Sequence, residues 1–156
     1  MTTTKSERLS EMPYVSQNHG PSLDTVSGMP TWIYKNIFDH SRDGIILHQP
    51  TGQVLEFNAT AAEMFGYSAD AAKALNIEQL HPPEEALKAK EWFARVLEKG
   101  EFSFKTKFIR QNGQSFPAEV LANLFEVNGQ QIIYSSIRDS TKRKRFKAAF
   151  RQQLEK

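Results

Sequence analysis

The spacing of apolar positions changes along the chain, from no regular period in residues 1–29 to a helical period that begins at Pro30. The first segment is rich in Ser, Thr, Pro and Gly and has only scattered apolar residues. Such a composition buries too little surface to offset the entropy of ordering, which predicts a flexible leader. From Pro30 a broad apolar stripe continues to Phe38, and the turn residues 41–44 end it. We therefore expect a first helix directly after the leader.

Two short segments rich in β-forming residues follow, 44–49 and 53–58, and the Pro-Thr-Gly sequence between them predicts a hairpin. Helical spacing returns over residues 59–65, where Gly66 closes the helix. Further helical segments are expected in this order: a short helix over 69–74, one turn over 76–80 and a longer helix from Pro83 to Gly100. Helices therefore separate this hairpin from the strands that come later.

The second half of the domain has the period of two that is typical of strands. Apolar side chains share one face over 102–108 and again over 116–124. Asn112-Gly113 and Asn128-Gly129 each predict a two-residue turn, so these strands and a third over 131–138 form an antiparallel meander. Strands at both ends of the domain with helices between them predict an α+β fold, in which one antiparallel sheet has helices on one face.

The composition fits one soluble domain. A 39% share of hydrophobic residues in 156 positions is enough for a single core and too high for a disordered chain. No run approaches 18 apolar residues and the N-terminus lacks the apolar stretch of a signal peptide, so we expect no membrane segment and a cytoplasmic location. The absence of cysteine excludes disulfides, thiolate nucleophiles and cofactors attached through sulfur.

Positive charge is concentrated at the C-terminal end. Residues 138–156 hold eight Lys or Arg and two Asp or Glu, a net of +6, whereas the other residues hold twelve basic and sixteen acidic side chains, a net of −4. The segment from Thr141 has helical spacing, with Phe146, Phe150 and Leu154 at i, i+4 and i+8. We interpret it as a solvated helix whose apolar stripe pairs with another helix, in preference to a nucleic-acid interface, which usually needs more basic residues on one face.

The first helix is a second candidate for a dimer surface. Ile33 with Ile37, and Tyr34 with Phe38, give it more apolar surface than one sheet face needs. Packing of the same residues into the core is the alternative, and both interpretations stay open at this point.

Several short motifs occur in an order that resembles the PAS domain, the sensor and dimerisation module of signalling proteins. They are Asp43-Gly44-Ile45, Asn58-Ala59 with Met64-Phe65-Gly66-Tyr67-Ser68, Leu80-His81-Pro82, Arg110-Gln111-Asn112-Gly113, and Asp139-Ser140-Thr141. Each motif alone is weak, but together they cover the chain from about Trp32 to Phe150 in register with the predicted elements.

The resemblance implies a PAS fold: a five-stranded antiparallel sheet with helices on one face, flanked by N-terminal and C-terminal signalling helices. Residues 30–140 would then form the sensor domain, and residues 141–156 would begin the output helix. The resemblance further implies a sensory and dimerisation module of a bacterial signal-transduction protein, as in two-component systems, which couples a small ligand or cofactor in its cavity to that helix. We expect a homodimer, with an effector domain or partner protein reached through the C-terminal helix.

The resemblance also implies roles for particular residues. Asn58 can cap the following helix and Gly66 can adopt the left-handed turn that ends it. Asp139 would pair with Arg110 while Thr141 caps the exit helix, and this group would form a signal latch. Ser140 stands where the family usually has an aliphatic residue.

The lack of cysteine excludes two PAS subfamilies, those with a flavin-cysteinyl adduct and those with a thioester-linked chromophore. One alternative is a heme-based gas or redox sensor, because His81 ends a segment that resembles the one carrying the axial histidine in oxygen-sensing heme PAS domains. A second alternative is a ligand-free adaptor that only assembles partners. We expect no catalysis: Asp43 or His48 could act as a base, but no nucleophile–base pair or Gly-rich phosphate loop is visible.

Overall fold

The chain divides after His40 into two units, and the first contains the predicted first helix. The computed structural model describes residues 25–26 and 29–155. In the first unit β1 (Thr25–Val26) pairs antiparallel with β2 (Met29–Pro30), and α2 (Thr31–Asp39) follows. Structure therefore begins before Pro30, within the segment expected to be a leader. The rest of that leader lies outside the described residues.

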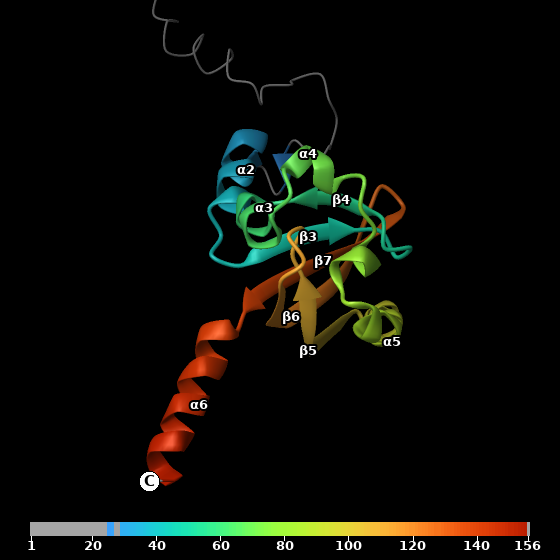
Figure 1. Cartoon of the computed structure of the whole chain (residues 1–156). Helices are drawn as coiled ribbons and strands as arrows, with labels where there is room; N and C mark the ends of the chain where they lie inside the picture. Colours follow the sequence, from blue (N-terminus) through green and yellow to red (C-terminus); the bar gives the residue numbers. More distant parts are fainter. Residues whose placement is uncertain (1–24, 27–28, 156) are drawn as a thin grey trace, which may run out of the picture. The chain divides into compact units, whose positions relative to one another are not determined.

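The second unit is built on a five-stranded antiparallel sheet with the strand order β4-β3-β7-β6-β5. Its strands are β3 (Gly44–His48), β4 (Val54–Phe57), β5 (Glu101–Ile109), β6 (Ser115–Val127) and β7 (Gln130–Asp139). The helices between β4 and β5 are α3 (Ala59–Phe65), α4 (Ala69–Ala72), the 3-10 helix η1 (Ile77–Leu80) and α5 (Pro83–Lys99), and α6 (Thr141–Glu155) follows β7 (Figure 1). The predicted α+β fold with one five-stranded antiparallel sheet is confirmed.

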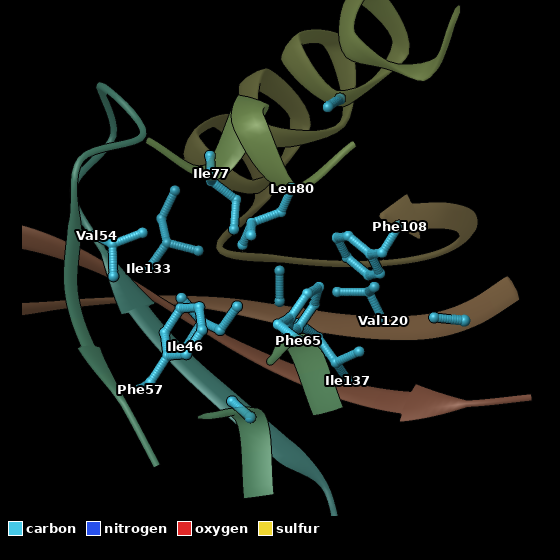
Figure 2. Packing of buried hydrophobic residues seen from close by; sticks show 14 of the residues in the cluster. Ile46, Val54, Phe57, Phe65, Ile77, Leu80, Phe108, Val120, Ile133 and Ile137 are labelled. Atoms are coloured by element: carbon cyan, nitrogen blue, oxygen red, sulfur yellow. The ribbon is translucent and has the colours of Figure 1, made fainter. Parts of the chain in front are cut away.

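This topology explains where the core lies. β4 and β5 are the two edge strands, so the helices that connect them in sequence run from one edge of the sheet to the other across one face. Apolar side chains from these helices meet the inward positions of the strands, and Phe65 is fully buried at the centre (Figure 2). Its ring contacts those of Phe57, Phe108 and Phe116, with centroids 5.7, 5.1 and 5.5 Å away. Aromatic contacts of this kind add to the stabilisation that burial provides.

The two Asn-Gly sequences form different turns. At Asn128-Gly129 both residues have positive φ, +51° and +79°, as a two-residue type I′ turn requires. At Asn112-Gly113 only Gly113 does, and the loop between β5 and β6 is longer, since Ile109 pairs with Ser115. The expected two-residue turn is therefore wrong at this site. The longer loop carries Arg110 and lets the Gln111 amide donate to the Phe65 carbonyl at 2.8 Å.

Candidate functional site

Asn58 connects the start of β3 to the start of α3. Its buried Oδ1 accepts from the amides of Ile45 and Ala61, each at 2.8 Å, while Nδ2 donates to the Asp43 carbonyl at 3.1 Å. The predicted cap is thus accompanied by two contacts to the start of β3, one to Ile45 and one to Asp43 just before the strand. Gly66 ends α3 in the left-handed conformation, with φ +83°, which a residue with a side chain adopts only with strain.

The structure brings Asp139, Thr141 and Arg110 together where the sheet ends and α6 begins. Arg110 Nη2 donates to Asp139 Oδ2 at 3.2 Å. Asp139 Oδ1 accepts from the Thr141 amide at 2.9 Å and from its hydroxyl at 2.5 Å. The expectation that Thr141 caps the exit helix is therefore wrong, because Asp139 is the acceptor. The carboxylate of Asp139 accepts from the first amide of the helix, where negative charge is favoured, and the Thr141 hydroxyl donates to it.

The charge state of Asp139 follows from these contacts. Partial burial raises the pKa of the Asp139 carboxyl, but the hydrogen bonds from Thr141 and the neighbouring guanidinium of Arg110 outweigh that effect. The net result is a pKa below the usual value of an aspartate. Asp139 is therefore ionised at neutral pH, and the pair with Arg110 is charged on both sides.

Arg110 has two further contacts that the sequence did not indicate. Nη1 donates to the Met64 carbonyl near the end of α3, and the guanidinium carbon lies 4.1 Å from the centroid of the Phe116 ring on β6. The alternation of β6 places Phe116 inward, but only the conformation of the β5–β6 loop brings Arg110 over its ring. Arg110 consequently contacts the helical layer at Met64, the sheet at Phe116 and the last residue of β7, Asp139, which holds the first amide of α6.

Ser140 is held through its backbone. Its amide donates to the Pro117 carbonyl at 3.0 Å, and its carbonyl accepts from the Lys144 amide at 3.0 Å as the first turn of α6 forms. The residue is buried. The position that is aliphatic in the family thus receives a small side chain here, while main-chain contacts fix the entry into α6.

Two histidines lie in the interior of the second unit, and both are neutral at physiological pH. His48 on β3 and His81 after η1 are 0% and 4% exposed. Burial is the main cause that lowers the pKa of each to about 4. Both stay uncharged because the interior disfavours the imidazolium form.

Their hydrogen bonds determine which ring nitrogen carries the proton. His48 Nδ1 faces the Gln49 carbonyl at 3.0 Å and must donate to it, so Nε2 accepts from the Ser135 hydroxyl at 3.3 Å. His81 Nδ1 in the same way donates to the Lys107 carbonyl at 3.2 Å. His81 Nε2 is then a buried acceptor, and it has no hydrogen-bond partner among the described residues.

The surroundings of His81 are aromatic. The Phe108 ring lies 4.6 Å and the Trp92 ring 6.3 Å from the imidazole centroid, and Trp92 stacks on Phe104 at 4.4 Å. A heme would find a suitable donor here, because an axial histidine ordinarily donates its other N–H to a carbonyl. These rings pack against the imidazole, however, and His81 lines none of four grooves formed by described residues. The residues therefore fit the ligand chemistry of heme, while the aromatic rings occupy the positions next to the imidazole.

Asp43 and His48 do not form a joint acid–base pair. Asp43 accepts from the Ser136 hydroxyl at 3.1 Å and from Arg138 Nε at 3.3 Å. His48 contacts the neighbouring Ser135. Because successive residues of a strand point to opposite faces, the two candidate bases lie on opposite sides of the sheet.

The apolar residues proposed for dimer surfaces differ in their exposure. On α6, Phe146, Phe150 and Leu154 are exposed, and on α2 Ile37 is exposed while Ile33 is half-buried. Phe38 is only 8% exposed, which favours packing, the second of the two interpretations of this helix, for that residue.

Comparison with known proteins assigns the family. The model of the PAS domain family matches residues 42–142, about two thirds of the chain. The chain belongs to the PAS domain family. This confirms the resemblance seen in the short motifs.

Two curated relatives and one solved PAS domain illustrate the similarity. The chain is 28% identical over 123 residues to the sensor histidine kinase TmoS of Ectopseudomonas mendocina. It is 26% identical over 119 residues to the methyl sulfide methyltransferase-associated sensor of Methanosarcina acetivorans. The matches cover 76% of this chain but only 13% and 12% of those proteins. The crystal structure of a PAS domain from Colwellia psychrerythraea has a TM-score of 0.66 at 18% identity, covering 71% of this chain and 97% of that domain.

This PAS domain is therefore a sensory module related to those of sensor histidine kinases. Every helix among the described residues is too short or too polar to cross a lipid bilayer.

Proposed function

We propose that this PAS domain is the cytoplasmic input module of a signalling protein, in which changes in the interior around His81 are relayed to α6 through Arg110 and Asp139. The observation that carries the proposal is a continuous series of contacts. It begins in the interior, where the ring of His81 packs on Phe108 at 4.6 Å and Phe108 packs on Phe116 with centroids 5.9 Å apart. The guanidinium of Arg110 lies over Phe116.

The series continues from Arg110 to the output helix. Arg110 holds Asp139 at 3.2 Å, and Asp139 holds the first amide of α6 through Thr141. A displacement of Phe116 therefore acts on the ion pair, and the ion pair acts on the helix start. The elements concerned are packed against one another, so a small shift in the interior has a route to α6 that crosses no solvent.

The chemistry of the interior favours a small neutral ligand that donates a hydrogen bond. His81 Nε2 is an acceptor without a partner in the described part of the chain, and a buried acceptor left unpaired costs free energy. A donor placed against it would recover that cost. Charged ligands are disfavoured because both interior histidines are neutral and the surrounding rings are apolar.

The relay is tested by a double-mutant cycle with amide hydrogen exchange in α6 as the readout. His81→Phe perturbs the interior and Asp139→Asn weakens the ion pair. We expect His81→Phe to change exchange in the first two turns of α6 in the wild-type background and to have little further effect in the Asp139→Asn background. Asp70→Asn is the control, because it removes one carboxylate near the start of a different helix, α4, at an exposed position. Equal effects of His81→Phe in both backgrounds would contradict the relay.

A heme-based sensor with His81 as axial ligand is the second candidate. It is favoured because Nδ1 of His81 donates to the Lys107 carbonyl, while Nε2 has no hydrogen-bond partner among the described residues and could bind the iron. An absorption spectrum of the purified protein incubated with hemin distinguishes it. A Soret band that is lost in His81→Ala would establish heme binding, whereas an unchanged hemin spectrum would remove this candidate.

A ligand-free adaptor is the third candidate, and the filled interior around His81 favours it. In that case the protein assembles partners through α2 and α6, and His81 contributes only to packing. Thermal unfolding in the presence of phenol as a probe, a small neutral ring with one hydroxyl donor, separates the two. Stabilisation that requires His81 supports the ligand-binding function, and no stabilisation favours the adaptor.

A further inference from the structure

α6 carries an apolar stripe on its exposed surface. Phe146, Phe150 and Leu154 are 72%, 55% and 71% exposed. The rings of the two phenylalanines stack on each other at 6.4 Å, and so form one continuous apolar surface. Exposed apolar surface of this extent on a helix indicates that another element covers it.

A cationic groove lies on one side of this helix. It is formed by α6 with the middle of β5 and the first half of β6, and five of its lining side chains are basic: Lys105, Arg143, Lys144, Lys147 and Arg151. The one acidic residue that lines it, Glu119, is paired with Arg143 at 2.6 Å. The other four cations have no ion pair among the described residues.

The second side of α6 is also basic. A separate groove there is lined by Arg110, Lys142 and Arg145, and by Asp139. Arg110 and Asp139 satisfy each other, while Lys142 and Arg145 have no ion pair within the described part of the chain. Residues 141–154 contain six Lys or Arg and no Asp or Glu. The apolar stripe thus lies between two cationic flanks.

These flanks oppose pairing of α6 with a second copy of itself. Two identical helices joined along the stripe would bring Lys and Arg next to Lys and Arg on both sides of the seam, and such contacts are destabilising.

We propose that α6 binds an amphipathic helix with acidic flanks, supplied by a partner, in preference to a second copy of α6. This inference rests on the proposed role of α6 as the output element. The apolar face of the partner covers Phe146, Phe150 and Leu154, and its carboxylates pair with the unpaired cations on either side. Charge complementarity then selects the partner, and the apolar stripe supplies most of the contact area.

A charge-reversed copy of the whole chain serves as the acidic partner in the test. It carries Lys142→Glu, Arg145→Glu, Lys147→Glu and Arg151→Glu, and it keeps Arg143 with its partner Glu119. Sedimentation velocity is measured for each protein alone and for the equimolar mixture, at about 50 mM and about 500 mM salt. A milder copy with only the last two reversals is run in parallel in case the first folds poorly.

We expect the mixture to form a one-to-one complex at low salt that is at least tenfold weaker at high salt. The complex is lost when Phe146→Ala and Phe150→Ala are introduced in both chains. The same pair of substitutions leaves the association state of the wild-type protein alone unchanged. A wild-type dimer that depends on Phe146 and Phe150 and is as tight as the mixed complex would overturn the proposal.

Other polyanions are included as competing outcomes. Phosphatidylserine vesicles and a single-stranded oligonucleotide are titrated with the wild-type protein, and binding to either that is tighter than binding to the charge-reversed chain overturns the proposal. The hydrogen-exchange cycle uses one isolated chain without a partner. Failure of the relay and failure of this inference are therefore distinguishable.

Discussion

Arg110 and Asp139 form an ion pair with 3.2 Å between Nη2 and Oδ2, at the place where the last strand gives way to α6. Twenty-eight residues separate the two in sequence, so the pair depends on the β5–β6 loop and the end of β7 meeting in space. Both side chains are mostly buried, 22% and 30% exposed, which shields the pair from solvent more than an ordinary surface pair.

Replacement of Arg110 tests how much this junction stabilises the domain. Arg110→Ala removes the ion pair, the hydrogen bond to the Met64 carbonyl and the stacking on Phe116. We expect the free energy of unfolding to fall by about 1–3 kcal/mol, measured by urea denaturation. Arg110→Lys should recover only part of the loss, since an ammonium cannot make these contacts at once.

Arg95 provides the control for Arg110. It lies over Phe102 at 5.6 Å, is exposed and has no ion pair in the described part of the chain. Arg95→Ala should cost less than about 1 kcal/mol. Equal losses for the two alanine variants would show that Arg110 contributes only through its ring contact.

The lowered pKa of Asp139 predicts a specific dependence of stability on pH. The folded pKa lies below the unfolded value of 3.8, so the stabilisation from the ionised carboxylate is present above that value and is lost as pH falls through the folded pKa. The stability difference between wild type and Asp139→Asn should therefore be constant near neutral pH and shrink below about pH 4. Urea denaturation at a series of pH values measures it. A difference that persists unchanged in acid would mean that the contribution does not depend on ionisation.

The interior histidines predict a separate loss of stability in mild acid. Each has a folded pKa of about 4 and an unfolded value of 6.5, so the unfolded chain binds protons first as pH falls between them. Stability is complete above pH 6.5 and declines toward pH 4, by up to about 1.4 kcal/mol per pH unit for each histidine. His81→Gln removes one titrating group and should reduce the slope by about half in the same denaturation series.

Asn58 and Ser68 allow two helix caps in one chain to be compared. Asn58→Ala leaves the buried amide of Ile45 unpaired as well as removing the cap of α3, and we expect a loss of about 2–4 kcal/mol. Ser68 only accepts from the Ala71 amide at the exposed start of α4, so Ser68→Ala should cost about 0.5–1 kcal/mol. Thermal or urea unfolding of both variants measures the difference. Similar losses would indicate that the contacts of Asn58 to β3 contribute little.

The helices and strands could be predicted because their signals are local. Alternation over 102–108 and 116–124 marks the buried face of two strands, and Gly66 marks the end of α3. These features depend on the period of the backbone, which neighbouring residues determine. One error arose where a contact between residues far apart in sequence decides the conformation. Asn112-Gly113 belongs to a longer loop that docks on the end of α3, where the Gln111 amide donates to the Phe65 carbonyl.

The sequence indicated which residues belong to the candidate site, but not how they contact one another. The motif Asp139-Ser140-Thr141 indicated that Asp139, Thr141 and Arg110 belong together, but the sequence did not show that Asp139 is the capping acceptor or that Arg110 lies over Phe116. The direction of a hydrogen bond and the position of a guanidinium depend on atoms contributed by several elements. The same holds for His81 Nε2, because a missing partner is a property of the surrounding side chains.

The sequence alone was enough to predict the order of the elements, the exclusion of cysteine-linked chromophores and the concentration of positive charge in the last helix, which follow from composition or from short-range periodicity. The PAS fold followed from the resemblance of its short motifs to that family. The tertiary structure was needed to show that the two interior histidines are neutral, that aromatic rings pack against His81, and that cations line α6 on both sides of its apolar stripe. Burial, cavity volume and the pairing of charges depend on which residues meet in space, and that information is absent from any local segment of the chain.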